Sequence, residues 1–176
     1  GINITIGGNI SVDSSSTVVL PTAGTTELNG TYAQQINMNG NRFYKLNITN
    51  PSTINFTSSF RTTSFEIRKG GTQILFLAGS ANGATITNDI MIQGNLTNLI
   101  LMNSSNATQW FINAPTTQDV DMVRVQNSNA SQGQTITAVG STDTGGNQNW
   151  VFQSNNSVPI TINEPYNNTL FNVSTI

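Results

Sequence analysis

Residues 43–56 read FYKLNITNPSTINF, and this stretch decides the fold class. In its first half Leu46 and Ile48 alternate with polar neighbours, and in its second half Ile54 and Phe56 do the same. Alternation with a period of two places the apolar side chains on one face of an extended strand. The asparagine, proline and serine at 50–52 are typical of a turn. The stretch therefore predicts two short strands joined by a tight turn.

The same pattern recurs along the chain in short bursts bounded by Gly, Asn, Ser or Pro. No segment keeps the apolar spacing i, i+3, i+4, i+7 long enough for a helix. The runs 74–77 and 99–102 are apolar on both faces, which is typical of strands covered on both sides. We therefore expect an all-β protein. The bursts are Ile2–Ile6, Ile10–Val12, Phe65–Ile67, Ile90–Ile92, Trp110–Ile112, Val123–Val125, Trp150–Phe152 and Ile160–Ile162.

The spacing of the bursts favours a parallel β-helix or β-solenoid. Leu46 and Phe65, and likewise Ile90 and Trp110, are roughly 20 residues apart in the sequence, a length at which successive coils stack. The later bursts follow one another at shorter intervals. Asparagines at the turns of successive coils would hydrogen-bond as stacked amides. The alternative is a pilin-like β-sandwich in which the asparagines fill hairpin turns.

Composition excludes several function classes. The 176 residues are 8% charged with a net charge of −2, so the chain lacks the basic surface of a nucleic-acid binder. No apolar run approaches the roughly 18 residues of a membrane span. The chain has neither Cys nor His, which removes Ser-His-Asp, Cys-His and histidine-metal chemistry. We expect no enzymatic activity and no cofactor. The 68 Asn, Thr and Ser residues suit an exported protein, which predicts an extracellular or cell-surface location.

Two regions resemble a known group of proteins. Phe43–Thr49 followed by Ser52–Phe56 resembles the opening rung of extracellular, right-handed parallel β-helix proteins of the bacterial and archaeal cell surface, which are described as adhesin-like. Met122–Ala130, Thr135–Ala138 and Ser141–Phe152 are similar to the closing rungs of that group. The resemblance implies a β-helix with a structural or adhesive role, and it implies no catalytic residues.

The chain ends suggest contacts with other copies. We expect an N-terminal strand or arm over residues 1–16, a β-helix-like domain over 17–157, and one or two C-terminal strands over 158–176 that cap the core or meet another subunit. Because the terminal strands of a solenoid leave backbone groups unpaired, a donor strand from a neighbour can add there. The alternative is that 2–6 is the first strand of its own domain. The candidate subunit-contact residues are Ile2, Ile4, Ile6, Ile10 and Val12.

Asn-x-Ser/Thr sequons are frequent, and roughly half of them are expected from composition alone. The excess predicts N-glycosylation of a secreted protein. The alternative is an Asn/Thr-rich alternating strand composition. The twelve candidate sites are Asn3, Asn9, Asn29, Asn47, Asn55, Asn95, Asn103, Asn106, Asn129, Asn155, Asn167 and Asn172.

Two further clusters are candidates for binding. Asp119 and Asp121 share one face of a strand and, with Asp143, form a candidate calcium site through oxygen ligands, or an acid/base pair of the glycosidase kind. The alternative is a salt bridge from Arg124 or a solvated turn. Four aromatic residues would form a sugar-stacking platform if exposed on one face, and core packing is the alternative. They are Tyr44, Trp110, Trp150 and Tyr166.

Together these features predict a secreted structural subunit that assembles with itself into an extracellular, pilus- or fibre-like filament through strand addition. A carbohydrate- or host-binding adhesin module is the second expectation, and a small polysaccharide-active β-helix enzyme is the third. The expected partners are further copies of the chain and attached or bound glycans, with no nucleic acid and no membrane span.

Overall fold

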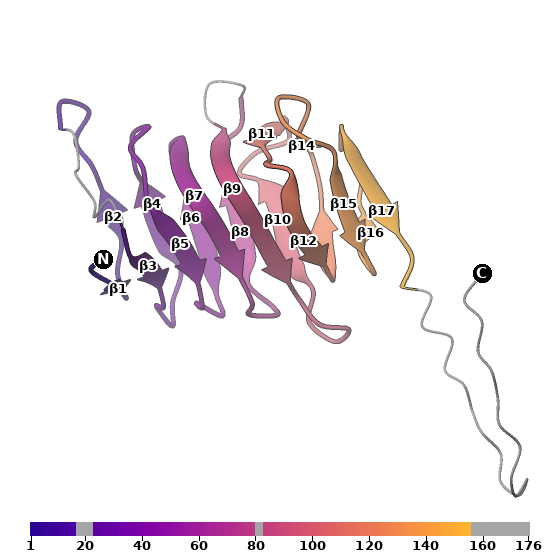
Figure 1. Cartoon of the computed structure of the whole chain (residues 1–176), viewed down its shortest axis with the longest axis horizontal. Coiled ribbons are helices and arrows are strands. Elements are labelled where there is room, and N and C mark those ends of the chain that lie inside the picture. Colours follow the sequence, from indigo (N-terminus) through magenta and orange to yellow (C-terminus); the bar gives the residue numbers. More distant parts are fainter. Residues whose placement is uncertain (17–22, 80–82, 156–176) are drawn as a thin grey trace, which may run out of the picture.

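A computed structural model describes residues 1–16, 23–79 and 83–155. Within these ranges the chain forms strands and turns and no helix. The strands pair in parallel and build two facing sheets, so the chain coils into a β-solenoid with β1 at one end and β17 at the other (Figure 1). This confirms the predicted solenoid. The sandwich alternative is wrong, because sandwich sheets are antiparallel.

Each coil contributes one strand to each of two sheets, and two short extra strands lie beside the first sheet. The first sheet consists, in order, of β1 (Ile4–Ile6), β3 (Thr25–Leu28), β5 (Lys45–Ile48), β7 (Phe60–Ile67), β9 (Ala84–Gln93), β12 (Thr117–Asp121), β15 (Ile136–Val139) and β17 (Trp150–Gln153). The second sheet consists of β2 (Ile10–Ser11), β4 (Gln34–Asn37), β6 (Thr53–Phe56), β8 (Gln73–Phe76), β10 (Ile100–Ser104), β13 (Val123–Val125) and β16 (Thr142–Asp143). The extra strands are β11 (Trp110–Asn113), which pairs with β9, and β14 (Ser128–Asn129), which pairs with β11.

The alternating residues stack in columns through the core. Leu28, Ile48, Ile67, Ile92 and Val120 follow one another in register on five successive strands of the first sheet, and all are buried. In-register stacking explains why alternation is kept in every coil, since a slip of one residue would turn these side chains to solvent.

The predicted stacking partners are only partly correct. Leu46 pairs with Phe65, so the step between these two residues is one coil. Ile90 pairs with Gln118 instead of Trp110, because β11 is inserted between β9 and β12 and lengthens that coil. Among the later, shorter steps, the one from Ile136 to Trp150 joins stacked positions.

Aromatic side chains fill the centre of the wider coils. The rings of Phe56 and Phe60 stack at 4.3 Å between centroids, and those of Phe76 and Trp110 stack at 4.0 Å. Trp110 is 0% exposed, and its indole Nε1 donates a hydrogen bond to the carbonyl of Gln126 at 2.9 Å. Buried aromatic residues of this size dominate core energetics, and the indole N–H needs the partner it finds here.

A column of buried polar side chains connects successive coils at one turn. Gln34 Nε2 donates to the carbonyl oxygens of Ile6 at 3.1 Å and Gly8 at 2.5 Å. Asn50 Nδ2 donates to Gln34 Oε1 at 2.8 Å, and Thr72 Oγ1 donates to the Asn50 carbonyl at 2.7 Å. The predicted asparagine ladder is found in part: Asn50 and Gln34 bond through their side-chain amides, whereas Thr72 bonds the backbone carbonyl of Asn50.

The N-terminal segment forms the first coil of the solenoid. Ile4–Ile6 pairs with β3 and Ile10–Ser11 pairs with β4 of the same chain, as the intramolecular alternative expects. The exchange of this strand between copies therefore stays a prediction. The expected C-terminal strands over 158–176 lie outside the described residues.

Candidate functional site

The first end of the solenoid exposes apolar side chains on an open sheet edge. In the described part of the chain, β1 pairs with β3 alone and β2 with β4 alone, so their outer edges have no partner strand. Ile4, Ile6 and Ile10 are half-buried, although the equivalent positions of later coils are buried. Of the other predicted contact residues, Ile2 is 69% exposed and Val12 is buried. The open edge and the half-buried isoleucines make this end a surface able to take another coil.

The second end has the same character. Within residues 83–155, β17 pairs with β15 alone and β16 with β13 alone. Trp150 and Phe152 are half-buried, and their rings stack at 5.8 Å. The indole Nε1 of Trp150 donates to Ser128 Oγ at 3.0 Å. Val151, on the other face of the strand, is 45% exposed. Both ends therefore present a parallel edge strand with apolar residues facing the core.

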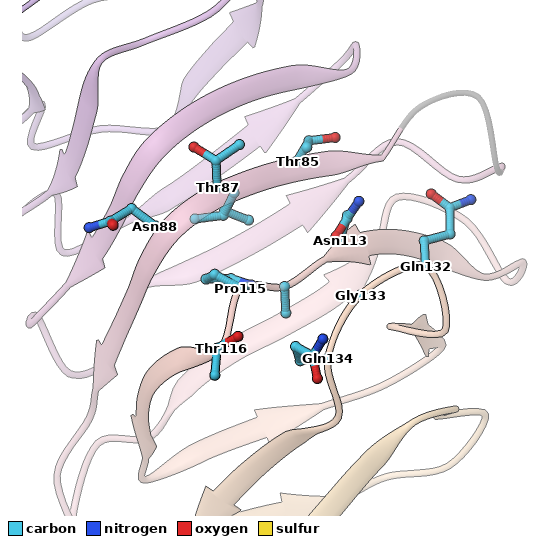
Figure 2. Close-up of a pocket in the computed structure, with 11 residues that line it drawn as sticks. Thr85, Thr87, Asn88, Asn113, Pro115, Thr116, Gln132, Gly133 and Gln134 are labelled. Atoms are coloured by element: carbon cyan, nitrogen blue, oxygen red, sulfur yellow. The ribbon is translucent and has the colours of Figure 1, made fainter.

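A groove runs along one side of the solenoid between its ends. Its central hollow of about 460 Å³ lies among β9, the segment between β11 and β12, and the loop before β15 (Figure 2). This hollow shares Thr85 and Gln132 with one neighbouring hollow of about 140 Å³. It shares Thr116 and Gln134 with another of about 310 Å³. The three hollows therefore form one shallow groove that crosses several coils.

Stacked positions on successive coils build the wall of this groove. Arg61 pairs with Thr85, and Thr85 pairs with Asn113. Next to Asn113 the chain comes so close that a Cβ at Gly133 would lie 2.3 Å from the nitrogen of Ala114, so glycine is required there. Because these residues come from separate coils with unequal spacing, sequence reasoning missed the groove. If the coils had equal lengths, the spacing of these residues in the sequence would have predicted that they stack.

The three acidic candidates do not meet. Asp119 and Asp121 lie on β12 of the first sheet, whereas Asp143 lies on β16 of the second. Asp119 Oδ2 accepts from Gln93 Nε2 at 2.6 Å, and Asp143 Oδ1 accepts from Asn147 Nδ2 at 2.6 Å. Among the described residues, no group of three acidic, histidine or cysteine side chains is arranged to hold a metal ion. The structure thus separates the ligands of the predicted calcium site.

Asp121 nevertheless has an unusual environment. Burial raises the pKa of its carboxyl group above the ordinary value, and the neighbouring charge of Asp119 raises this pKa further. Its Oδ1 is buried and has no hydrogen-bond partner in the described part of the chain. Arg124 is exposed and does not pair with it, since the ion pair found within the described ranges joins Arg68 and Glu66 at 2.6 Å. The expected Arg124 salt bridge is therefore not formed.

The predicted aromatic platform does not assemble either. Trp110 is buried in the core, and Trp150 lies at the far end of the first sheet from Tyr44, which precedes β5. Tyr166 lies outside the described residues. In an alternating run a tryptophan can face either the core or the solvent, and the side chain of Trp110 faces the core.

The sequons fall into two groups. Asn47, Asn55, Asn103 and Asn129 are partly buried on strands, and the Nδ2 groups of the last two donate to Gln126 and Gln148. Asn167 and Asn172 lie outside the described residues. The exposed sequon asparagines remain accessible to a modifying enzyme, and their glycosylation stays a prediction. They are Asn3, Asn9, Asn29, Asn95, Asn106 and Asn155.

The structure contains, in its described residues, no helix with the length and apolar character needed to span a bilayer. Comparisons with protein-family models, with curated proteins and with solved structures return no match. The resemblance to adhesin-like β-helix surface proteins therefore stays a prediction, and what can be stated of this chain is its parallel β-solenoid fold.

Proposed function

We propose that this chain is a structural module of an extracellular filament, in which solenoids stack end to end. One observation carries the proposal: among the residues that the structure describes, both ends of the first sheet have an open parallel edge strand whose half-buried apolar residues continue the buried columns of the core. Such an end leaves both backbone groups and apolar surface in need of a partner.

The register of the sheet specifies how two copies would meet. Ile4 begins the column that contains Leu46 and Phe65, and Trp150 lies at the corresponding position of the last strand. Stacking β17 of one copy on β1 of the next would place Trp150 beside Ile4 and Phe152 beside Ile6. The contact repeats the parallel pairing found between β15 and β17.

In the described part of the chain, the two edge strands lack charged residues and proline, two of the usual protections against such pairing. Natural edges are commonly guarded by charged residues, proline or bulges. Ile4–Ile6 and Trp150–Gln153 contain no charged residue and no proline. Because the two surfaces differ, the contact is head-to-tail. Because each copy would continue the solenoid axis of the previous one, the contact would not close into a ring and would generate a fibre. In this contact a whole coil of one copy stacks on the next copy, whereas the sequence alone predicts the addition of a detached donor strand.

The test compares the full chain with variants that place a charge at one end. Ile6→Lys and Phe152→Lys each put a lysine in the proposed contact, and Gln35→Lys is the matched control on an exposed position of β4. We expect filaments from the parent chain and from the control in electron micrographs, and monomers from each end variant in sedimentation. Circular dichroism should show the same strand content in all four proteins.

Mixing the two end variants adds a second check. Each retains one intact end, so the mixture should form dimers and nothing longer. A parent chain that stays monomeric at high concentration would contradict the proposal. So would filaments from either end variant, or a mixture that stays monomeric.

A further inference from the structure

We propose that the groove between the solenoid ends binds a linear, uncharged polysaccharide chain lying along the solenoid axis. This inference does not depend on end-to-end stacking. It rests on the continuity of the groove, on the side chains that line it and on their lack of partners within the described part of the chain.

The shape of the groove fits a polymer. The three hollows are joined by shared lining residues and extend from Ser59 and Arg61, through Thr85 and Asn113, to Thr137 on β15. Successive coils are about 4.8 Å apart. That spacing is close to the length of one sugar residue in an extended chain, so consecutive sugars would meet equivalent positions on consecutive coils.

The polar side chains of the groove are free to bind a ligand. In the described part of the chain, six of them make no side-chain hydrogen bond: Thr85, Thr87, Asn113, Thr116, Gln132 and Gln134. Several amides elsewhere are engaged, as in Asn50, Asn147 and Asn149, whose Nδ2 groups donate to carbonyls or to another amide. What distinguishes the groove is that its unpaired amides and hydroxyls line one set of hollows. Figure 2 shows the free side chains around one hollow, from β9 and from the two segments beside it.

The chemistry of these groups matches sugar hydroxyls. Primary amides and hydroxyls both donate and accept hydrogen bonds, as sugar hydroxyls do. Ala114 and Pro115, both buried, supply apolar surface to the same hollow. Sugar rings also present apolar C–H faces, so a mixture of amides, hydroxyls and small apolar surface suits them.

Charge restricts the ligand to an uncharged chain. Arg61, at one end, is the charged residue among those lining the three hollows. The nearby carboxylate of Asp89 accepts hydrogen bonds from Ser64 Oγ and from Asn88 Nδ2. A regularly charged polymer such as a polyuronate would need a cation at each coil, and the groove does not offer this.

The test titrates the full chain with oligosaccharides of increasing length from the cellulose, chitin and starch series, with oligogalacturonate as the charged comparison. We expect one uncharged series to bind. Its affinity should rise with length and level off at about four sugars, because the groove crosses four successive strands of the first sheet, β7, β9, β12 and β15, with about one sugar to each. Chemical-shift changes in NMR spectra would report weak binding and locate it.

Variants connect the binding to the groove. Asn113→Ala and Gln134→Ala should each weaken binding about fivefold, the effect of one lost hydrogen bond. Thr85→Trp should abolish binding by filling the groove. Gln35→Ala, an exposed glutamine on the opposite sheet, is the matched control and should bind like the parent chain. Thermal unfolding followed by circular dichroism identifies any variant that has lost its fold.

The inference would be overturned by no binding of any uncharged series, by equal weakening by Gln35→Ala, or by a preference for oligogalacturonate that Arg61→Gln removes. The end variant Ile6→Lys separates this inference from the filament, since it blocks stacking and leaves the groove unchanged. If Ile6→Lys binds sugar like the parent chain, the groove acts independently of assembly. If it loses binding, the site requires the stacked ends and the groove assignment fails.

Discussion

The wide coils between β5 and β11 and the narrow coils between β15 and β17 are held together differently. The chain segment from Ile90 to its stacked partner Gln118 is much longer than the segment from Ile136 to Trp150. The wide coils enclose a cluster of buried aromatic rings, and the last coil has its own aromatic pair half-exposed at the end. Buried apolar side chains therefore contribute most of the stability of the wide coils, and the narrow coils have a smaller apolar core.

Turn geometry compensates in the narrow coils. Asn149, immediately before β17, has a φ of 60°, in the left-handed region that few residues other than glycine and asparagine adopt readily. Asn149 Nδ2 donates to the carbonyl of Ala130 at 3.0 Å, and Asn147 Nδ2 donates to that of Val125 at 2.9 Å. Side-chain hydrogen bonds from asparagines thus fix the tight corners where few apolar contacts are available.

The largest effect should come from the two tryptophans. Trp110→Ala removes a fully buried ring and leaves a cavity, so we expect it to reduce the free energy of unfolding by ~3–5 kcal/mol. Trp150→Ala should cost about 1–2 kcal/mol, because that ring is only half-buried. Urea unfolding at low protein concentration, where copies remain separate, measures both. Equal losses would show that the two regions do not differ as described.

A smaller difference is expected between two asparagines. Asn50→Ala removes the donor to the Tyr32 carbonyl and leaves Gln34 Oε1 with the Gly30 N–H at 3.2 Å as its remaining donor, which should cost about 1–3 kcal/mol. Asn149→Gly also loses its hydrogen bonds, but glycine accepts the positive φ and water reaches that half-buried turn. Its loss should therefore be the smaller of the two in the same urea experiment. A greater loss for Asn149→Gly would contradict this ranking.

The smallest effect concerns Asp121 and pH. Its pKa is raised in the folded state, so between the unfolded and folded pKa values the native protein binds more protons, and stability falls as pH rises through that window. Asp121→Asn should therefore raise the melting temperature at neutral pH. At about pH 2.5, below the ordinary aspartate pKa of about 3.9, the two proteins should melt alike. Thermal melts at both pH values test this, and a stabilisation that is equal at both would contradict the titration argument.

The regular coils could be predicted from sequence, and the irregular ones could not. Alternation at Leu46 and Ile48 and the single-coil step to Phe65 indicate parallel stacking directly. The position of Trp110 depends on the insertion of β11, which alternation does not reveal, because the pattern gives the faces of a strand and not its neighbours.

The two proposed binding surfaces also differ in how far the sequence predicts them. The open ends follow from the solenoid itself, so the half-buried position of Ile4 and Ile6 on an edge strand could be predicted, and their contact with another copy stays a proposal. The groove could not, because Thr85, Asn113 and Gln134 become neighbours only through unequal coil lengths. Asp119 and Asp143 show the reverse case, since two residues that were predicted to lie together are on different sheets.

Engineered cysteines test most directly whether the ends meet, because the chain has no cysteine of its own. Thr5 and Val151 are exposed residues of β1 and β17, and in the proposed stack they lie opposite each other on neighbouring copies. The double variant Thr5→Cys/Val151→Cys should give a ladder of disulfide-linked multimers after mild oxidation. Gln35→Cys/Val151→Cys, with one cysteine moved to β4, should give none. A ladder from the control alone, or monomers from both double variants, would contradict head-to-tail stacking.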